Sequence, residues 1–136
     1  MLNQTSDLAA HSIFRIIDAN LNRLREGLRV IEDIYRYLYD NREISYRLKA
    51  LRHSVKIAEY KELLKARDSK KDVLKQSTQS ETKREDLQSI LLANFKRTQE
   101  SARTLEEILK LTNTKDSEHF KNIRYELYNL EKEILS

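Results

Sequence analysis

The sequence has no cysteine, no proline and no tryptophan, and its only glycine is Gly27. Without cysteine, disulfides and thiolate-bound metals are excluded. The tight turns of a sheet protein draw on glycine and proline, so their scarcity favours long helices joined by few loops. Three histidines among 136 residues also argue against a histidine-rich metal site.

Long apolar runs are missing too. No stretch approaches the roughly 18 apolar residues that cross a bilayer, and the first twenty residues show no signal-peptide pattern. We therefore expect a cytoplasmic protein with no membrane partner. The length suits one hydrophobic core, so we predict a single helical domain over residues 1–136.

Basic residues slightly outnumber acidic ones, with 26 Lys and Arg against 22 Asp and Glu and a net charge of +4. This mild excess suits an anionic small ligand. Nucleic-acid binding would need an exposed basic stripe unbalanced by acids, whereas acids interleave with the arginines here. We therefore predict no nucleic-acid partner.

Apolar residues spaced three or four apart predict an all-α fold, a four-helix bundle. The helices are expected at about 7–39, 43–65, 86–111 and 116–135, with a break near Tyr60, Asp40-Asn41 capping the second helix and Asp116 capping the fourth. Short connections make two antiparallel hairpins, at about 7–66 and 86–135. Between them, about 67–85 is a long polar loop, either a lid or a plain surface loop.

An internal repeat links the two hairpins. RIIDANLNRLREGLRVIED (15–33) aligns without a gap with SILLANFKRTQESARTLEE (89–107), and both contain A-N-φ-x-R-x-x-E-x-x-R-x-φ-E, where φ is apolar. A shorter match pairs LKALRH (48–53) with FKNIRY (120–125). We predict two similar hairpins that face each other with approximate internal two-fold symmetry.

At about 100° per residue, the repeated polar residues divide between two sides of the helix. In the first copy, Asn20, Arg23 and Gly27 lie on or beside the apolar face. Arg29 and Glu32 lie nearly opposite and should face solvent or another helix. The matched residues of the second copy are Asn94, Arg97, Ser101, Arg103 and Glu106.

Most of these residues have a structural interpretation beside a functional one. Asn20 and Asn94 could hydrogen-bond each other, Gly27 could let two helices cross closely, and the outer residues could form surface ion pairs worth about 0.2–0.5 kcal/mol. Arg23 and Arg97 are more informative. An arginine at the border of a core, repeated by symmetry, is placed to bind an anion bidentately.

Five segments also carry a family resemblance. They are D-A-N-L-N-R-x-R-E-G-L-R-V-x-E-D (18–33), L-K-x-x-R-H (48–53), A-R-D-x-x-x-D-V (66–73), A-N-x-x-R-x-x-E-x-x-R-x-L-E-E (93–107) and R-Y-x-x-Y (124–128). Together they resemble the small all-helical hydroxymethylpyrimidine phosphate kinase family of thiamine biosynthesis, which occurs alone or fused in front of thiamine-phosphate synthase. One departure is Leu74, where that family usually carries glycine.

The resemblance implies ATP-dependent phosphorylation of 4-amino-5-hydroxymethyl-2-methylpyrimidine phosphate to the diphosphate, with Mg²⁺ accompanying the nucleotide. The chain has no glycine-rich phosphate loop, so side chains must hold the phosphates. The acceptor is a phosphate monoester with a second pKa of about 6, so it needs no general base. Phosphoryl transfer then depends on positioning and charge neutralisation, which suits an arginine-rich pocket.

On this interpretation the predicted catalytic residues are Arg23 and Arg97. The residues predicted to bind substrate or phosphate are Asn20, Asn94, Lys49, Arg52, His53, Arg67 and Arg124. The predicted Mg²⁺ ligands are Asp68, Asp72 and Glu26, because Mg²⁺ needs only one or two carboxylates beside the phosphates. For the two aspartates a solvated loop is the alternative, and for His53 a structural role.

Two further partners are compatible with these features, thiamine-phosphate synthase and a second copy of the chain. The main rival is a non-catalytic helical module that binds or regulates a partner and takes its name from a fused synthase. That reading explains the bundle and the polar loop. It explains poorly why Asn and Arg recur at inner positions of both hairpins.

Overall fold

The computed structural model describes residues 7–77 and 84–136, so the middle of the predicted polar loop, at 78–83, lies outside the described residues. The described part is helical and holds no strand, which confirms the all-α prediction. Its α-helices are α1 (Asp7–Asp33), α2 (Arg42–His53), α3 (Tyr60–Ala66), α5 (Leu87–Ile108) and α6 (Thr114–Leu135). The shorter elements are the π-helix η2 (Ile34–Leu38) and the 3-10 turns η3 (Ser69–Lys71) and η4 (Leu109–Leu111).

The second predicted helix is two helices in the structure, because the chain leaves α2 at His53 and re-enters a helix only at Tyr60. The break therefore comes earlier and lasts longer than predicted. Tertiary contacts hold it: Val55 is buried, and its carbonyl oxygen accepts a hydrogen bond from Nε of Arg25 at 2.9 Å. A carbonyl outside a helix needs such a donor once it is removed from water.

One asparagine caps the second helix of each hairpin. Asn41 accepts from the backbone N–H of Ile44 at the start of α2, which confirms the predicted cap. Asn113 caps α6 by accepting from the N–H groups of Lys115 and Asp116. The fourth helix therefore starts two residues before Asp116, and the prediction of Asp116 as its cap was wrong. An asparagine amide oxygen satisfies these exposed N–H groups as well as a carboxylate does.

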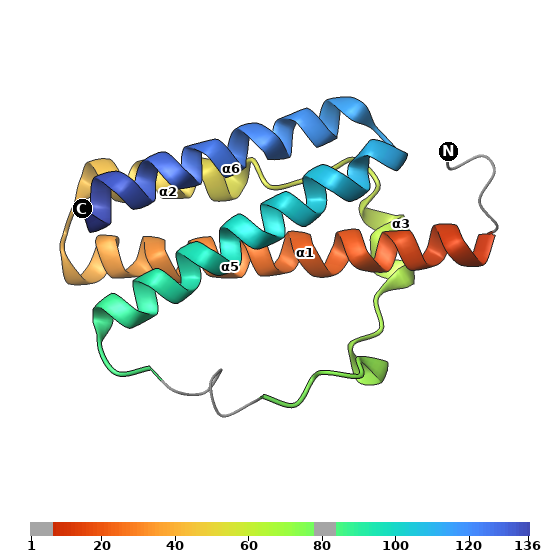
Figure 1. Ribbon diagram of the computed structural model, residues 1–136, viewed down its shortest axis with the longest axis horizontal. Helices are drawn as coiled ribbons and strands as arrows, with labels where there is room; N and C mark the ends of the chain where they lie inside the picture. The colour runs from red at the N-terminus through yellow and green to blue at the C-terminus, as the bar shows by residue number, and fades with distance from the viewer. Residues whose placement is uncertain (1–6, 78–83) are drawn as a thin grey trace.

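Helix α1 is central and packs against α2, α3 and α5, while α5 also packs against α6. Figure 1 shows α5 crossing α1 obliquely and running in the opposite direction, with α6 along the upper side. Apolar residues from all these helices form one core. Its fully buried members include Leu24 and Leu28 of α1, Phe95 of α5 and Phe120 of α6.

Gly27 lies where α1 and α5 approach closely. A Cβ atom at this position would lie 2.7 Å from Cγ2 of Thr98 and 3.5 Å from the carbonyl oxygen of Asn94. The first distance is shorter than carbon atoms tolerate, so a larger residue at 27 would have to displace the side chain of Thr98. The proposed packing role of Gly27 is confirmed.

The described part of the polar segment leaves the helical body after α3 and carries the turn η3 (Figure 1). Its beginning is fixed to α1, because Nε and Nη2 of Arg67 donate to the two carboxylate oxygens of Asp18, each at 2.8 Å. No helix in the described ranges is long and apolar enough to cross a membrane.

Candidate anion-binding site

A groove of about 490 Å³ opens beside the crossing of α1 and α5, and we call it the α1–α5 groove. Two of its lining residues come from α1, which carries the first repeat, and the others come from α5, which carries the second. They are Asn20, Arg23, Ala93, Lys96, Arg97, Glu100, Ser101 and Thr104. The structure thus brings the two predicted catalytic arginines, one from each repeat, to a single groove.

Arg23 and Arg97 differ from most arginines of this chain in having no ion pair or hydrogen bond within the described part of the structure. Both side chains are exposed. Lys96, in the same groove, is instead paired with Glu131 at 3.4 Å. Because two unpaired guanidinium groups outnumber the single acid of the groove, Glu100, the arrangement favours an anionic ligand.

The two repeated asparagines do not bond each other, as the structural interpretation of them had supposed. Nδ2 of Asn20 donates to the carbonyl of Ile16 at 2.9 Å, and Nδ2 of Asn94 donates to that of Ile90 at 2.8 Å. Each amide therefore bonds the preceding turn of its own helix. Asn20 lines the groove, whereas the backbone carbonyl of Asn94 faces Gly27. The side-chain Oδ1 of Asn94 is buried and has no hydrogen-bond partner within the described ranges.

Two residues expected on the outer face of the helix are buried ion-pair partners. Glu32 is 1% exposed and accepts from Nε of Arg52 at 2.7 Å. Glu106 is 6% exposed and accepts from Nη2 of Arg124 at 2.9 Å. Both glutamates therefore face another helix, which was one of the two predicted alternatives, because α2 and α6 cover the side of the repeated helices away from the groove. Solvent exposure, the other alternative, was wrong for both.

Of the two ion pairs expected three residues apart on this side, Arg103 with Glu106 forms, whereas Arg29 pairs with Asp33 instead of Glu32. Arg29 lies 3.5 Å from Asp33, and Arg103 lies 3.0 Å from Glu106. Of the four side chains in these two contacts, only that of Glu106 is buried.

Three arginines predicted to bind phosphate are held by carboxylates of the same chain. Arg52 and Arg124 belong to the buried pairs, and Arg67 is bound by Asp18. The pKa of Arg67 is raised, first by its hydrogen bond with Asp18, and that of Arg124 is raised by its hydrogen bonds with Glu106 and Tyr128. Arg52 and Arg124 thus lie between helices, Arg67 lies at the end of α3, and none of the three lines the groove.

The predicted metal ligands do not form a cluster. Asp68 accepts from the backbone N–H of Lys71, and Asp72 accepts from that of Leu74, so both bond the polar segment itself. Glu26 is exposed on α1. Across the described ranges, no group of three or more His, Asp or Glu side chains could hold a metal ion. Glu100, the residue matched to Glu26, is the carboxylate that lines the groove.

Lys49 and His53 are exposed on α2. Lys49 lines a second pocket, at the turn between α1 and α2, and His53 lines neither pocket. Sequence reasoning missed Ala93, Lys96 and Thr104 as groove residues. The spacing of 93, 96, 97, 100 and 104, all on one face of α5, was a signal that could have found them.

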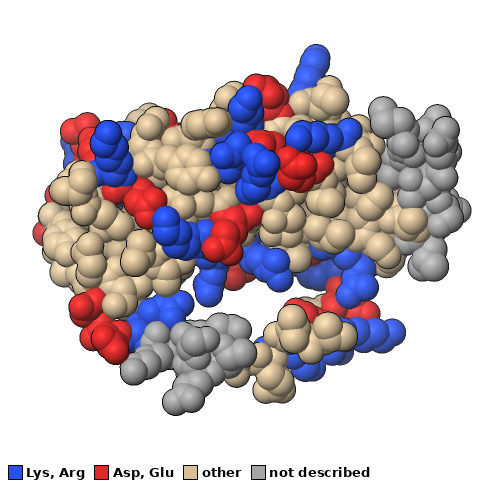
Figure 2. Space-filling view, viewed as in Figure 1, with Lys and Arg blue, Asp and Glu red and all other residues tan. Residues whose placement is uncertain are grey.

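Basic side chains gather along the lower edge of the helical body in Figure 2, above the polar segment.

The fold and the groove define a helical bundle with a cationic groove between two repeated helices. The ThiD2 family matches residues 15–133, and the chain belongs to that family.

Several curated proteins named thiamine-phosphate synthase are similar to this chain. The protein of Synechocystis sp. is 41% identical over 125 residues, which cover 91% of this chain and 36% of that protein. The protein of Thermosynechococcus vestitus is 43% identical, with coverages of 86% and 34%, and that of Rhodopirellula baltica is 36% identical, with 88% and 33%. The chain thus spans about a third of the length of these relatives. No solved structure matches it.

Proposed function

We propose that this chain is an ATP-dependent kinase that converts 4-amino-5-hydroxymethyl-2-methylpyrimidine phosphate to the diphosphate. The observation that carries the proposal is the meeting of Arg23 and Arg97 in one groove, with no acidic partner for either among the residues that the structure describes. Two guanidinium groups can each bind a phosphate bidentately and can neutralise two polyanions that must approach each other. One groove, built from both repeats, then forms one site rather than two.

The chemistry places few further demands on the chain. The attacking oxygen belongs to a phosphate that is already ionised near neutral pH, with a second pKa of about 6, so no basic side chain has to accept a proton. Asn20 also lines the groove, and the second N–H of its side-chain amide can donate to a bound phosphate. Charge neutralisation and positioning account for most of the catalysis in this reaction class.

Mg²⁺ is expected with the nucleotide, and Glu100 is our candidate protein ligand because it is the one carboxylate that lines the groove. One or two carboxylates suffice for a magnesium ion that is otherwise held by phosphates and water. The ion would supply additional positive charge at the transferring group. Asp68, Asp72 and Glu26 remain proposals for which this arrangement gives no support.

The relatives favour a role in making thiamine. Their names describe thiamine-phosphate synthases, and this chain matches about a third of their length. We propose that the helical third phosphorylates the pyrimidine phosphate, and that the remaining length of the relatives carries out the synthase reaction. This division also makes thiamine-phosphate synthase the proposed protein partner.

The proposal is tested by incubating the purified chain with ATP, Mg²⁺ and the pyrimidine phosphate, and by following the product with ³¹P NMR. We expect a diphosphate signal and ADP in equal amounts. The unphosphorylated pyrimidine alcohol is the matched control, and it should give no product because it brings no phosphate for an arginine to bind and its hydroxyl has no base to accept its proton. A lack of product with the phosphate, where a control kinase works, would instead favour a non-catalytic binding module.

A further inference from the structure

The turns of the two hairpins differ in length. The first turn runs from Glu32 to the capping residue Asn41. The second runs from the matched glutamate, Glu106, to the matched cap, Asn113, so the first turn is two residues longer. The additional residues are accommodated by the π-helix η2 and by Asp40, which adopts a positive φ of 48°. Both features are uncommon, and π-helical turns often accompany functional sites.

A serine on the second helix of each hairpin shows what the longer turn changes. Ser117 is buried, and its hydroxyl donates to the carbonyl of Glu106 at 2.6 Å, which closes the second turn. Ser45, at the matched position, has a buried Oγ atom that finds no hydrogen-bond partner among the described residues. A hydroxyl removed from water is costly when it is unpaired, so this atom marks a place that a ligand can satisfy.

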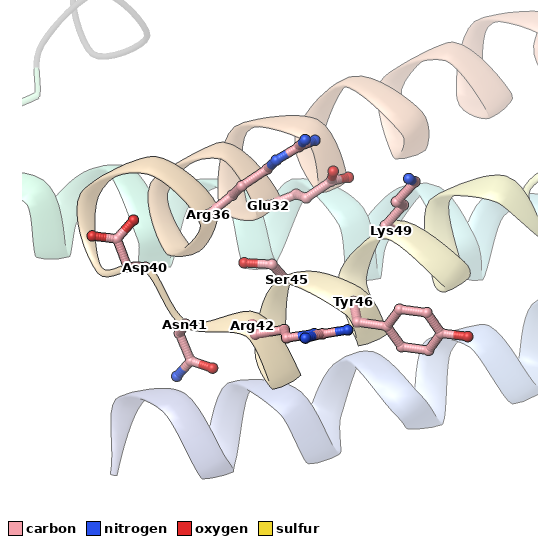
Figure 3. A pocket seen from close by; sticks show the side chains of 8 residues that line it. All are labelled: Glu32, Arg36, Asp40, Asn41, Arg42, Ser45, Tyr46 and Lys49. Carbon is pink, nitrogen blue, oxygen red and sulfur yellow. The ribbon is translucent and has the colours of Figure 1, made fainter.

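A pocket of about 410 Å³ lies at this first turn, and we call it the turn pocket. Arg36, Arg42 and Lys49 line it, and none of the three has an ion pair in the part of the chain that the structure describes. Figure 3 shows Arg36 and Lys49 reaching the same side of the pocket from opposite helices. Ser45 lies between those helices.

The acids of the turn pocket do not cancel this charge. Glu32 lines the pocket, but its side chain is only 1% exposed and its carboxylate accepts two hydrogen bonds from Arg52, at 2.7 and 3.4 Å. Asp40 is the other acid that lines it. Three unpaired cations against one unpaired carboxylate leave a net positive pocket, and its volume is within the range of small-molecule sites.

We propose that the turn pocket binds a phosphate-bearing small molecule, with Arg36, Arg42 and Lys49 as its cationic ligands and the hydroxyl of Ser45 as a hydrogen-bond donor. This site is separate from the α1–α5 groove. Arg23 and Arg36 are about 20 Å apart along the helix at 1.5 Å per residue, too far to share one transferring phosphate. The turn pocket is therefore a second anion site and does not depend on the proposed kinase activity.

The test is isothermal titration calorimetry of the chain with inorganic diphosphate, without ATP or pyrimidine. We expect two binding events in the wild type. The double variant Arg36→Gln/Lys49→Gln should lose one of them, and Arg23→Gln/Arg97→Gln should lose the other. Ser45→Ala should weaken binding at the turn pocket at least tenfold, while leaving the groove unchanged.

Lys121→Gln is the matched control, because Lys121 occupies the position of Lys49 in the second hairpin and should leave both events intact. The substituted cations of the turn pocket are exposed, so circular dichroism should show an unchanged helix content. The proposal is wrong if Arg36→Gln/Lys49→Gln binds diphosphate with the stoichiometry and affinity of the wild type. Failure of the kinase assay would not affect this result, since the titration involves no turnover.

Discussion

Arg124 holds Glu106 between α5 and α6, with Nη2 of the arginine 2.9 Å and 3.2 Å from the two carboxylate oxygens. Both side chains are nearly buried, at 10% and 6% exposed. Arg52 and Glu32 make the same contact between α1 and α2. Each hairpin is therefore joined internally by one charged pair, at positions that the two repeats share.

We expect Glu106→Ala to lower the free energy of unfolding by about 3 kcal/mol, because it leaves Arg124 buried without a counter-charge. Glu32→Ala should lower the free energy of unfolding in the same way, because it leaves Arg52 without its counter-charge. Urea denaturation followed by circular dichroism measures both. The control is Glu133→Ala, which removes an exposed partner of Arg47 and should cost less than about 1 kcal/mol. An equal loss for Glu106 and Glu133 would contradict the assignment of the buried pair.

Arg23→Ala and Arg97→Ala should each lower kcat/KM for the pyrimidine phosphate by about 100-fold, the effect of removing one preorganised donor from a developing charge. Neither change should alter helix content, since both side chains are exposed and unpaired in the described structure. Steady-state kinetics and circular dichroism test the two statements. Arg29→Ala is the control, because Arg29 is exposed but pairs with Asp33 away from the groove. Full activity in both groove variants would move the site elsewhere.

Gly27→Ala should destabilise the fold by about 1–3 kcal/mol, the usual cost of overpacking. The new Cβ would lie 2.7 Å from Cγ2 of Thr98. Thermal unfolding monitored by circular dichroism gives the change. The sign of the change in stability is informative, because alanine in an unhindered helix is about 1 kcal/mol more stable than glycine.

A double-mutant cycle identifies the clash. Thr98→Ser removes Cγ2 but keeps the hydroxyl that donates to the carbonyl of Phe95. Combined with Gly27→Ala, it should recover most of the lost stability, and the two changes should be strongly non-additive. Simple additivity of the two substitutions would show that Thr98 does not limit the approach of the helices.

Acid should remove a contribution from Asp86, which caps α5. The pKa of Asp86 is lowered from its ordinary value of 3.8, first by the backbone N–H of Ser89 and then by the serine hydroxyl. A group with a lowered folded-state pKa stabilises above its unfolded pKa, and the contribution disappears as pH falls through the folded value. The pKa of Glu107 is lowered in the same way by Lys110.

The melting temperature of Asp86→Asn, measured from pH 6 to pH 2.5, tests this dependence. Asparagine keeps a capping oxygen but carries no charge for the helix dipole. The wild type should be the more stable protein at pH 6, and the difference should shrink below about pH 4. A difference that stays constant over this range would show that the charge of Asp86 contributes nothing.

The sequence predicted the helical class and most helix ends because these depend on local features. Apolar spacing placed α1, α5 and α6, and the polar pair Asp40-Asn41 placed the first turn. The break between α2 and α3 was misplaced because no glycine or proline marks it. It depends instead on contacts such as that of Arg25 with the carbonyl of Val55, which are distant in sequence.

The candidate site was partly predictable for the same reason. The repeat identified Arg23 and Arg97 as a pair, and the helical angle placed both beside the core. The angle failed for Glu32 and Glu106 because a projection from one helix assumes one buried face, whereas α1 and α5 each have neighbours on two sides. Glu32 and Arg52 recur together in the second hairpin, as Glu106 and Arg124. This joint recurrence was the signal that would have corrected the placement of the glutamates.

The polar segment that starts at Arg67 has a consequence for the chain as a whole. Its described residues are almost all exposed, while the hairpins on either side are held to each other by the core between α1 and α5. The covalent connection between the hairpins keeps one near the other, at an effective concentration in the millimolar range typical of short linkers. A protease that cuts after Lys71 or Lys75 would leave two fragments that stay associated, and the halves could be expressed separately and recombined.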